Sequence, residues 1–191
     1  MDLDIVVAPE NSKAVKSFLK ERGFEEANNH ARDCVYDTKV VEYEKRFAPR
    51  EPIGFDLLVN GLGCRQTEAQ RSFDYLYNHS TEQNTSSGIS ATTARVVDGA
   101  VLIAAKLHSG REGNFRDVLA VAEEVELDAV TPHFRRGDVA ALRIQLEQGL
   151  DILEGEELKH GFRCDFGSSV VSKETIASLR AYLSDRIDQL S

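Results

Sequence analysis

Two short apolar runs that each carry aspartate constrain the fold of this chain most strongly. The first is DLDIVVAP at residues 2–9, and the second is IGFDLLVNG at residues 53–61. Both runs are rich in β-branched and large apolar residues, and each ends in a turn former, as is typical of β-strands. We therefore predict one strand at Leu3–Ala8 and another over IGFDLLV, each with one buried face.

The aspartates of these runs fall on the polar face of each predicted strand. Residues two apart in a strand point to the same side, so Asp2 and Asp4 share a face opposite the apolar residues. Asp56 likewise points away from the apolar positions of the second run. If the two strands are neighbours in one sheet, three carboxylates meet, and hard divalent cations such as Mg²⁺ prefer such ligands. The plainer alternative is that each aspartate is an ordinary exposed polar residue.

The first half of the chain mixes strand and helix patterns. A helix is expected from Asn11 to Gly23, and residues 33–47 alternate loosely, as two strands of a hairpin would. A further helix is expected at 66–78. The polar stretch at 78–94 has no periodicity, so we expect a solvated loop there, with a flexible substrate-facing loop as the alternative.

The second half is helical in pattern. Apolar residues recur at helical spacing, with capping residues before them, in segments at about 98–107, 114–124, 138–153 and 172–190. The predicted fold class is therefore α+β, a mixed sheet packed with helices and followed by a C-terminal helical region. The expected domains are an α/β core at 1–97 and a helical region at 98–191.

Composition narrows the functional classes. The chain has 191 residues, 41% of them hydrophobic, and no apolar stretch approaches the length of about 18 residues that crosses a bilayer. We therefore expect no membrane partner and a cytoplasmic location. The formal charge of −9 argues against nonspecific coating of DNA. Cys34, Cys64 and Cys164 form no CxxC pair, so reduced thiols are expected.

The order of these elements resembles the minimal nucleotidyltransferases of the DNA-polymerase-β-like superfamily, in particular their abortive-infection toxin-like branch. DLDIVV matches the family's strand with two aspartates, FLKERGF its helix end, and FDLLV its strand with a third aspartate. AAKLHSGREGNFRDVLAVA resembles the later helical segment and supplies Lys106, Arg111 and Asp117. The resemblance spans about residues 2–130 and rests on order and spacing.

This resemblance implies a metal-dependent transferase, which moves a nucleoside monophosphate from an NTP to a hydroxyl of RNA, protein or a small molecule. Asp2, Asp4 and Asp56 would be the catalytic Mg²⁺ ligands of a two-metal site, and Asp56 would also help to deprotonate the acceptor. The nucleotide or acceptor would be bound by Lys106, Arg111 and Asp117. The family setting is a toxin–antitoxin or phage-defence pair, so an antitoxin or other protein partner would use the helical half.

Two departures from the family pattern keep a second interpretation open. Asn114 stands where the family has an acidic residue, and the Gly-Gly or Gly-Ser turn that holds the triphosphate would be expected before Asp2. Without that turn, the chain would be a catalytically inactive binding or regulatory module of the same fold. A third alternative is an unrelated α/β protein whose acidic residues are incidental.

The residues of the later segment also have plainer interpretations. Lys106 could be a solvated lysine at the end of an apolar helix, and Arg111 with Asp117 could be a structural ion pair or cap. His108 lies beside Ser109, but nothing in the sequence supplies the third member of a catalytic triad. We therefore expect His108 at the surface.

Overall fold

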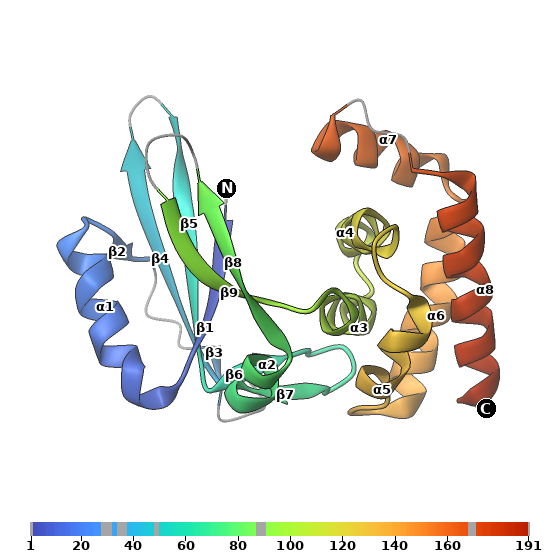
Figure 1. Cartoon of the computed structure of the whole chain (residues 1–191), viewed down its shortest axis with the longest axis horizontal. Coiled ribbons are helices and arrows are strands. Elements are labelled where there is room, and N and C mark those ends of the chain that lie inside the picture. The colour runs from blue at the N-terminus through green and yellow to red at the C-terminus, as the bar shows by residue number, and fades with distance from the viewer. Residues whose placement is uncertain are drawn as a thin grey trace. The chain divides into compact units, whose positions relative to one another are not determined.

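The computed structural model divides the chain into two compact units (Figure 1). The first comprises Met1–Gly63 and Gln70–Asn78, and the second comprises Cys64–Ala69 and His79–Ser191. The structure describes residues 2–27, 32–33, 38–47, 50–86, 91–167 and 171–190. The fold is mixed α+β, as predicted, with the sheet in the first unit and most helices in the second. The predicted boundary after residue 97 falls within the second unit.

A mixed sheet forms the first unit. Its strands are β1 (Asp2–Val7), β2 (Glu25–Glu26), β3 (Arg32–Asp33), β4 (Lys39–Phe47) and β5 (Arg50–Val59). The order is β1-β5-β4-β2, and β3 also pairs with β4. β1 runs parallel to β5, whereas β4 is antiparallel to β5, β2 and β3. The two aspartate-bearing strands are therefore neighbours, and an antiparallel pairing is present within 33–47, of which 34–37 lie outside the described residues.

One face of this sheet is apolar and packs against α1 (Ser12–Glu21), which follows a short 3₁₀ turn, η1 (Pro9–Asn11). Register places Ile5 beside Leu57, and Leu57 beside Val41 on the next strand. The cluster is completed by Leu19 of α1, and Leu57 is wholly buried. Because side chains alternate along a strand, the same register points the intervening residues to the other face.

The segment after β5 differs from the helix expected at 66–78. Gln70–Ser72 forms a strand, β7, which pairs with β6 (Gly61–Gly63), and helix α2 covers only Phe73–Asn78. Asn60 adopts a positive φ of 76°, as the predicted Asn-Gly turn requires. The prediction was wrong for 66–72 because non-local contacts override a weak helical pattern. Gln70–Ser72 pairs with β6, and residues 64–69 pack within the second unit.

Helices build the second unit. They are α3 (Gly99–Ser109), α4 (Glu112–Ala122), η2 (Leu127–Val130), α5 (Thr131–Phe134), α6 (Val139–Glu154), α7 (Glu156–Phe166) and α8 (Lys173–Gln189). Asp138 and Ser172 cap α6 and α8 by accepting backbone N–H groups. The core between the helices is apolar and includes the fully buried Ile103, Leu146 and Leu183. From Gly99 onward the elements of the described residues are helical, and the second unit also includes residues 64–69 and 79–97.

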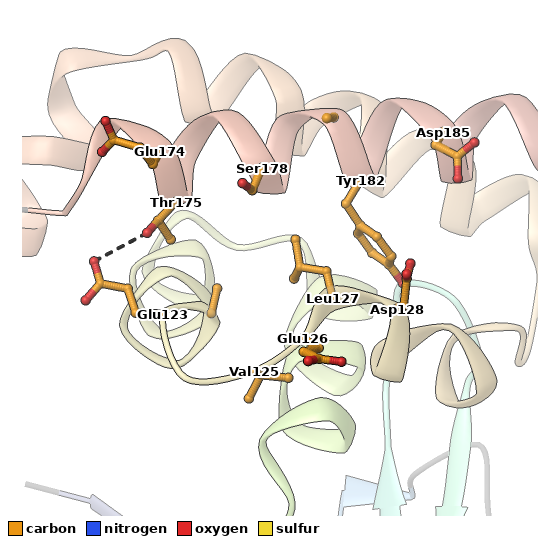
Figure 2. A pocket seen from close by; sticks show the side chains of 12 residues that line it. Glu123, Val125, Glu126, Leu127, Asp128, Glu174, Thr175, Ser178, Tyr182 and Asp185 are labelled. Carbon is orange, nitrogen blue, oxygen red and sulfur yellow. Dashed lines mark hydrogen bonds between the residues drawn. The ribbon is translucent and has the colours of Figure 1, made fainter.

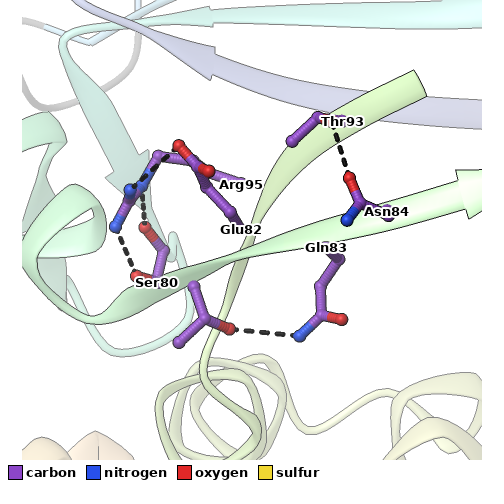
Figure 3. A network of polar contacts seen from close by, with 7 residues as sticks. Ser80, Glu82, Gln83, Asn84, Thr93 and Arg95 are labelled. Carbon is purple, nitrogen blue, oxygen red and sulfur yellow. Dashed lines mark hydrogen bonds and ion pairs between the residues drawn. The ribbon is translucent and has the colours of Figure 1, made fainter.

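A β-hairpin replaces the loop expected at 78–94. It consists of β8 (Ser80–Ser86) and β9 (Ala91–Val97), paired antiparallel. Polar groups connect its strands (Figure 3): Arg95 donates to the Ser80 hydroxyl at 3.0 Å, and Thr93 donates to Asn84 Oδ1 at 2.7 Å. The described side chains of both strands are largely exposed. The sequence hid this hairpin because its cross-strand pairs are polar and leave no apolar alternation to detect.

Within the described residues, no helix combines the length and apolar composition needed to cross a membrane.

Gly149 of α6 lies in close contact with the Phe115 ring of α4. A Cβ at this buried position of α6 would lie 2.3 Å from Cζ of Phe115, whereas a Cβ at Gly113, in the first turn of α4, would have its nearest neighbour at 3.5 Å. We expect Gly149→Ala to lower the free energy of unfolding by about 1–3 kcal/mol through overpacking. Gly113→Ala should raise it by about 0.5–1 kcal/mol through helix propensity. Urea denaturation measures the free energy of unfolding of both variants. Changes of the same sign in the two variants would contradict the close contact between Gly149 and Phe115.

Tyr43 is the buried polar side chain of the sheet core, 1% exposed, and its hydroxyl has no hydrogen-bond partner among the described residues. Burial, and secondarily the nearby Glu26 carboxylate, raise its pKa above the usual 10.0. The neutral phenol therefore stabilises the fold below about pH 10, and this contribution is lost as pH rises through the raised pKa.

We expect Tyr43→Phe to keep or raise the free energy of unfolding by up to about 1 kcal/mol near neutral pH, because an unpaired hydroxyl leaves the core. The variant should also lose less stability than the parent above about pH 10. Denaturant unfolding across that pH range tests both effects, with Tyr77→Phe as the exposed control. Equal alkaline destabilisation of parent and Tyr43→Phe would refute the assignment.

Candidate functional site

A row of three carboxylates crosses the face of the sheet opposite the apolar cluster. Asp4 on β1 is the register partner of Asp56 on β5, and Asp56 is the register partner of Glu42 on β4. Neighbouring strands lie about 4.8 Å apart, and register partners point to the same face. We call Asp4, Asp56 and Glu42 the acidic row. Asp4 is exposed, whereas Asp56 and Glu42 are partly buried.

The alternation of β4 explains why Glu42 joins this row. Val41 and Tyr43 on either side point into the apolar cluster, so Glu42 must point to the opposite face. Sequence reasoning missed Glu42, although the alternation of VVEYE carried the signal. It could not be recognised as a neighbour of Asp56 before the pairing of β4 with β5 was known.

Asp2 is the remaining predicted metal ligand. Its backbone pairs with Gly54 of β5, and its side chain lies outside the described part of the structure. Of the three predicted aspartates, the structure thus brings Asp4 and Asp56 side by side. The third described carboxylate of the row comes from β4.

In donor type alone, the acidic row matches the ligand preference of hard divalent cations. All three residues offer carboxylate oxygens, and a cation between them would offset the repulsion between like charges on adjacent strands. Among the described residues, no three acidic, imidazole or thiol side chains are grouped closely enough to hold an ion by themselves. Mg²⁺ commonly takes one or two protein carboxylates and completes its shell with water and phosphate oxygens.

The predicted nucleotide- or acceptor-binding residues lie in the second unit: Lys106 on α3, Arg111 at the turn after it, and Asp117 in the middle of α4. Lys106 Nζ lies 2.7 Å from Asp117 Oδ2, so these two residues form an ion pair across the two helices. Arg111 is exposed and occupies the N-cap position of α4. Because Lys106 and Asp117 are each about one-third to two-fifths exposed, the pair is worth less than about 1 kcal/mol.

His108 is fully buried, so the prediction of a surface position was wrong. Its Nε2 lies 2.8 Å from the carbonyl oxygen of Phe134, and its Nδ1 lies 2.8 Å from the Thr67 hydroxyl. A carbonyl only accepts, so Nε2 carries the proton and, in the neutral ring, Nδ1 accepts from Thr67. The Thr67 carbonyl in turn accepts from the backbone N–H of Asp138 at 2.7 Å. His108 therefore binds the 64–69 segment to the helical unit.

A pocket of about 730 Å³ lies in the second unit between the end of α4, η2 and α8 (Figure 2). Five carboxylates dominate its polar lining, which also includes three hydroxyl groups: Glu123, Glu126, Asp128, Glu174 and Asp185, with Thr175, Ser178 and Tyr182. The Thr175 hydroxyl donates to Glu123 at 3.4 Å, and burial raises the pKa of Tyr182 above 10.0. So many negative charges disfavour a triphosphate here, and we do not assign the nucleotide to this pocket.

Comparison with known proteins gives no match to any family model, curated protein or solved structure.

Thr67 gives a direct test of the His108 contact. Thr67→Val removes the hydroxyl that donates to Nδ1 but keeps the shape of the side chain, so we expect the free energy of unfolding to fall by about 1–3 kcal/mol. Thr67→Ser keeps the hydroxyl and should cost clearly less. Urea denaturation distinguishes them. A Thr67→Val variant as stable as Thr67→Ser would contradict the proposed hydrogen bond.

Proposed function

We propose that this chain is a metal-dependent nucleotidyltransferase, which transfers a nucleoside monophosphate from an NTP to an acceptor hydroxyl. The observation that carries the proposal is the pairing of Asp4 with Asp56 on neighbouring parallel strands, with Glu42 continuing the row. Paired carboxylates on a rigid sheet are suited to hold divalent cations beside a reacting phosphate. The resemblance in order and spacing of the sequence motifs supports the same chemistry.

The proposed roles follow from position in the acidic row. Asp4 and Asp56 would hold Mg²⁺, with Asp2 as a further ligand, and the ion would neutralise charge on the phosphates when bound. Asp56 is the central member of the row, between Asp4 and Glu42, and it would accept the proton of the acceptor hydroxyl. The hydroxyl oxygen would bond to the α-phosphorus while the bond to pyrophosphate breaks.

Three residues of the second unit would help to bind the nucleotide or the acceptor. Arg111 is exposed and offers a guanidinium suited to phosphate oxygens. Lys106 and Asp117 are paired with each other, so their contribution to nucleotide or acceptor binding would be made as an ion pair. A protein partner on the helical unit, in a toxin–antitoxin or phage-defence setting in the cytoplasm, belongs to the same proposal.

The proposal predicts that Asp56→Asn abolishes Mg²⁺-dependent transfer of label from an NTP. We expect at least a 100-fold loss of rate, about 2.7 kcal/mol of transition-state stabilisation, because a neutral amide neither binds the cation well nor accepts the proton. Transfer from α-labelled NTPs to RNA, protein and small-molecule acceptors would be measured together with Mg²⁺-dependent NTP binding. Circular dichroism would verify that the variant is folded.

Glu10→Gln is the matched control, because it removes one negative charge from an exposed residue of the first unit outside the acidic row. Its transfer rate should equal that of the parent. Metal-dependent NTP binding without transfer by the parent would favour the binding-module alternative and refute catalysis. If the parent neither binds nor transfers with Mg²⁺ present, the proposed function is wrong.

A further inference from the structure

His160 and Cys164 lie one turn apart on the exposed side of α7. Residues separated by four positions in a helix share one face, and both side chains are exposed. Cys164 Sγ and His160 Nε2 form a long hydrogen bond of 3.8 Å, so the sulfur and the ring nitrogen point toward each other. This pair belongs to the second unit and has no part in the acidic row of the first.

The separation of these two atoms matches what a tetrahedral metal requires. With Zn–S of about 2.3 Å, Zn–N of about 2.05 Å and a tetrahedral angle, sulfur and nitrogen lie about 3.6 Å apart. The observed 3.8 Å is therefore within about 0.2 Å of the separation in a metal complex. A thiolate with an imidazole also selects borderline metals such as Zn²⁺ over Mg²⁺, which prefers oxygen. We propose that His160 and Cys164 form a two-residue clamp for a thiophilic divalent cation of the Zn²⁺ type.

The helix that carries the clamp is anchored without any metal. Leu158 and Phe162 are buried in the core of the second unit, and Asp165, next to Cys164, pairs with Arg116 of α4 at 2.7 Å. The backbone between the two ligands is therefore already fixed, and little conformational entropy is lost when a metal binds. The clamp is thus present before the cation arrives.

Binding replaces a proton by the metal. The Cys164 S–H bond breaks as the sulfur–metal bond forms, and the proton passes to solvent, while the neutral imidazole of His160 donates its nitrogen lone pair. Because the chain supplies only two ligands here, water or exogenous ligands would complete the coordination of the cation. The cation brings two positive charges and the thiol loses one proton, so the net charge of the site rises by one.

Cys64 is the natural comparison for Cys164. It is the other described free thiol, but its sulfur lies against the Gln66 side chain at 3.2 Å and the His108 carbonyl at 3.1 Å. Neither neighbour is a good ligand for a thiophilic cation. Cys34 lies outside the described residues, and Cys34→Ser removes it from the experiment.

Cobalt titration tests the clamp, because Co²⁺ substitutes for Zn²⁺ and a Co–thiolate bond gives a charge-transfer band in the near ultraviolet. In a reduced Cys34→Ser background we expect this band to saturate at one Co²⁺ per chain and to be displaced by Zn²⁺. Cys164→Ser should abolish it, and His160→Ala should weaken Co²⁺ binding at least tenfold. Cys64→Ser should leave it unchanged.

Three results would overturn the clamp: no band in the background protein, a band that survives Cys164→Ser, or unchanged affinity in His160→Ala. Cation binding by the acidic row gives no thiolate band, so failure here is distinguishable from failure of the proposed transferase. Both substituted residues are exposed, and thermal unfolding followed by circular dichroism would establish that the variants are folded.

Discussion

The register of β1 against β5 is the constraint on which the first unit depends. Leu3 pairs with Phe55, Ile5 with Leu57 and Val7 with Val59, and most of these side chains enter the same apolar cluster. A slip of one residue would move every one of them to the polar face. The hydrophobic effect that fixes this register therefore also fixes Asp4 opposite Asp56. The acidic row is a consequence of core packing, whatever chemistry it performs.

Two acidic surfaces of this chain differ in the number and the placement of their carboxylates. The acidic row has carboxylates on three adjacent strands, with backbone positions fixed by sheet pairing. The pocket of the helical unit carries more carboxylates, together with hydroxyl and apolar groups, around a volume of about 730 Å³. A few fixed carboxylates can share a cation with a phosphate, whereas a larger surplus of negative charge repels the phosphate itself.

The elements that could be predicted from the sequence are those with a strong local signal. β1, β5 and α1 have clear periodicity with a stop residue, and α6 and α8 have in addition the caps Asp138 and Ser172. The β8–β9 hairpin was hidden because cross-strand polar pairs hold it. The helix expected at 66–78 was misjudged because non-local contacts direct this segment.

The candidate residues show the same division between local and non-local information. Alternation placed Asp4 and Asp56 each on the polar face of its own strand. That these strands are neighbours, and that Glu42 joins them, depended on the strand order. His108 was misplaced because its partners, Thr67 and the Phe134 carbonyl, are distant in sequence. The His160–Cys164 pair is the opposite case, since its spacing of four is visible in the sequence, whereas the distance between its atoms is not.

We expect the acidic row, rather than the acidic pocket of the helical unit, to bind a divalent cation. Paramagnetic broadening by Mn²⁺ in ¹⁵N-resolved NMR spectra tests it directly, because Mn²⁺ shares the oxygen preference of Mg²⁺. Substoichiometric Mn²⁺ should first broaden the amides next to Asp4, Glu42 and Asp56, and excess Mg²⁺ should restore them. Broadening that begins at Glu123, Glu126 and Asp128 while β1, β4 and β5 stay sharp would contradict the account.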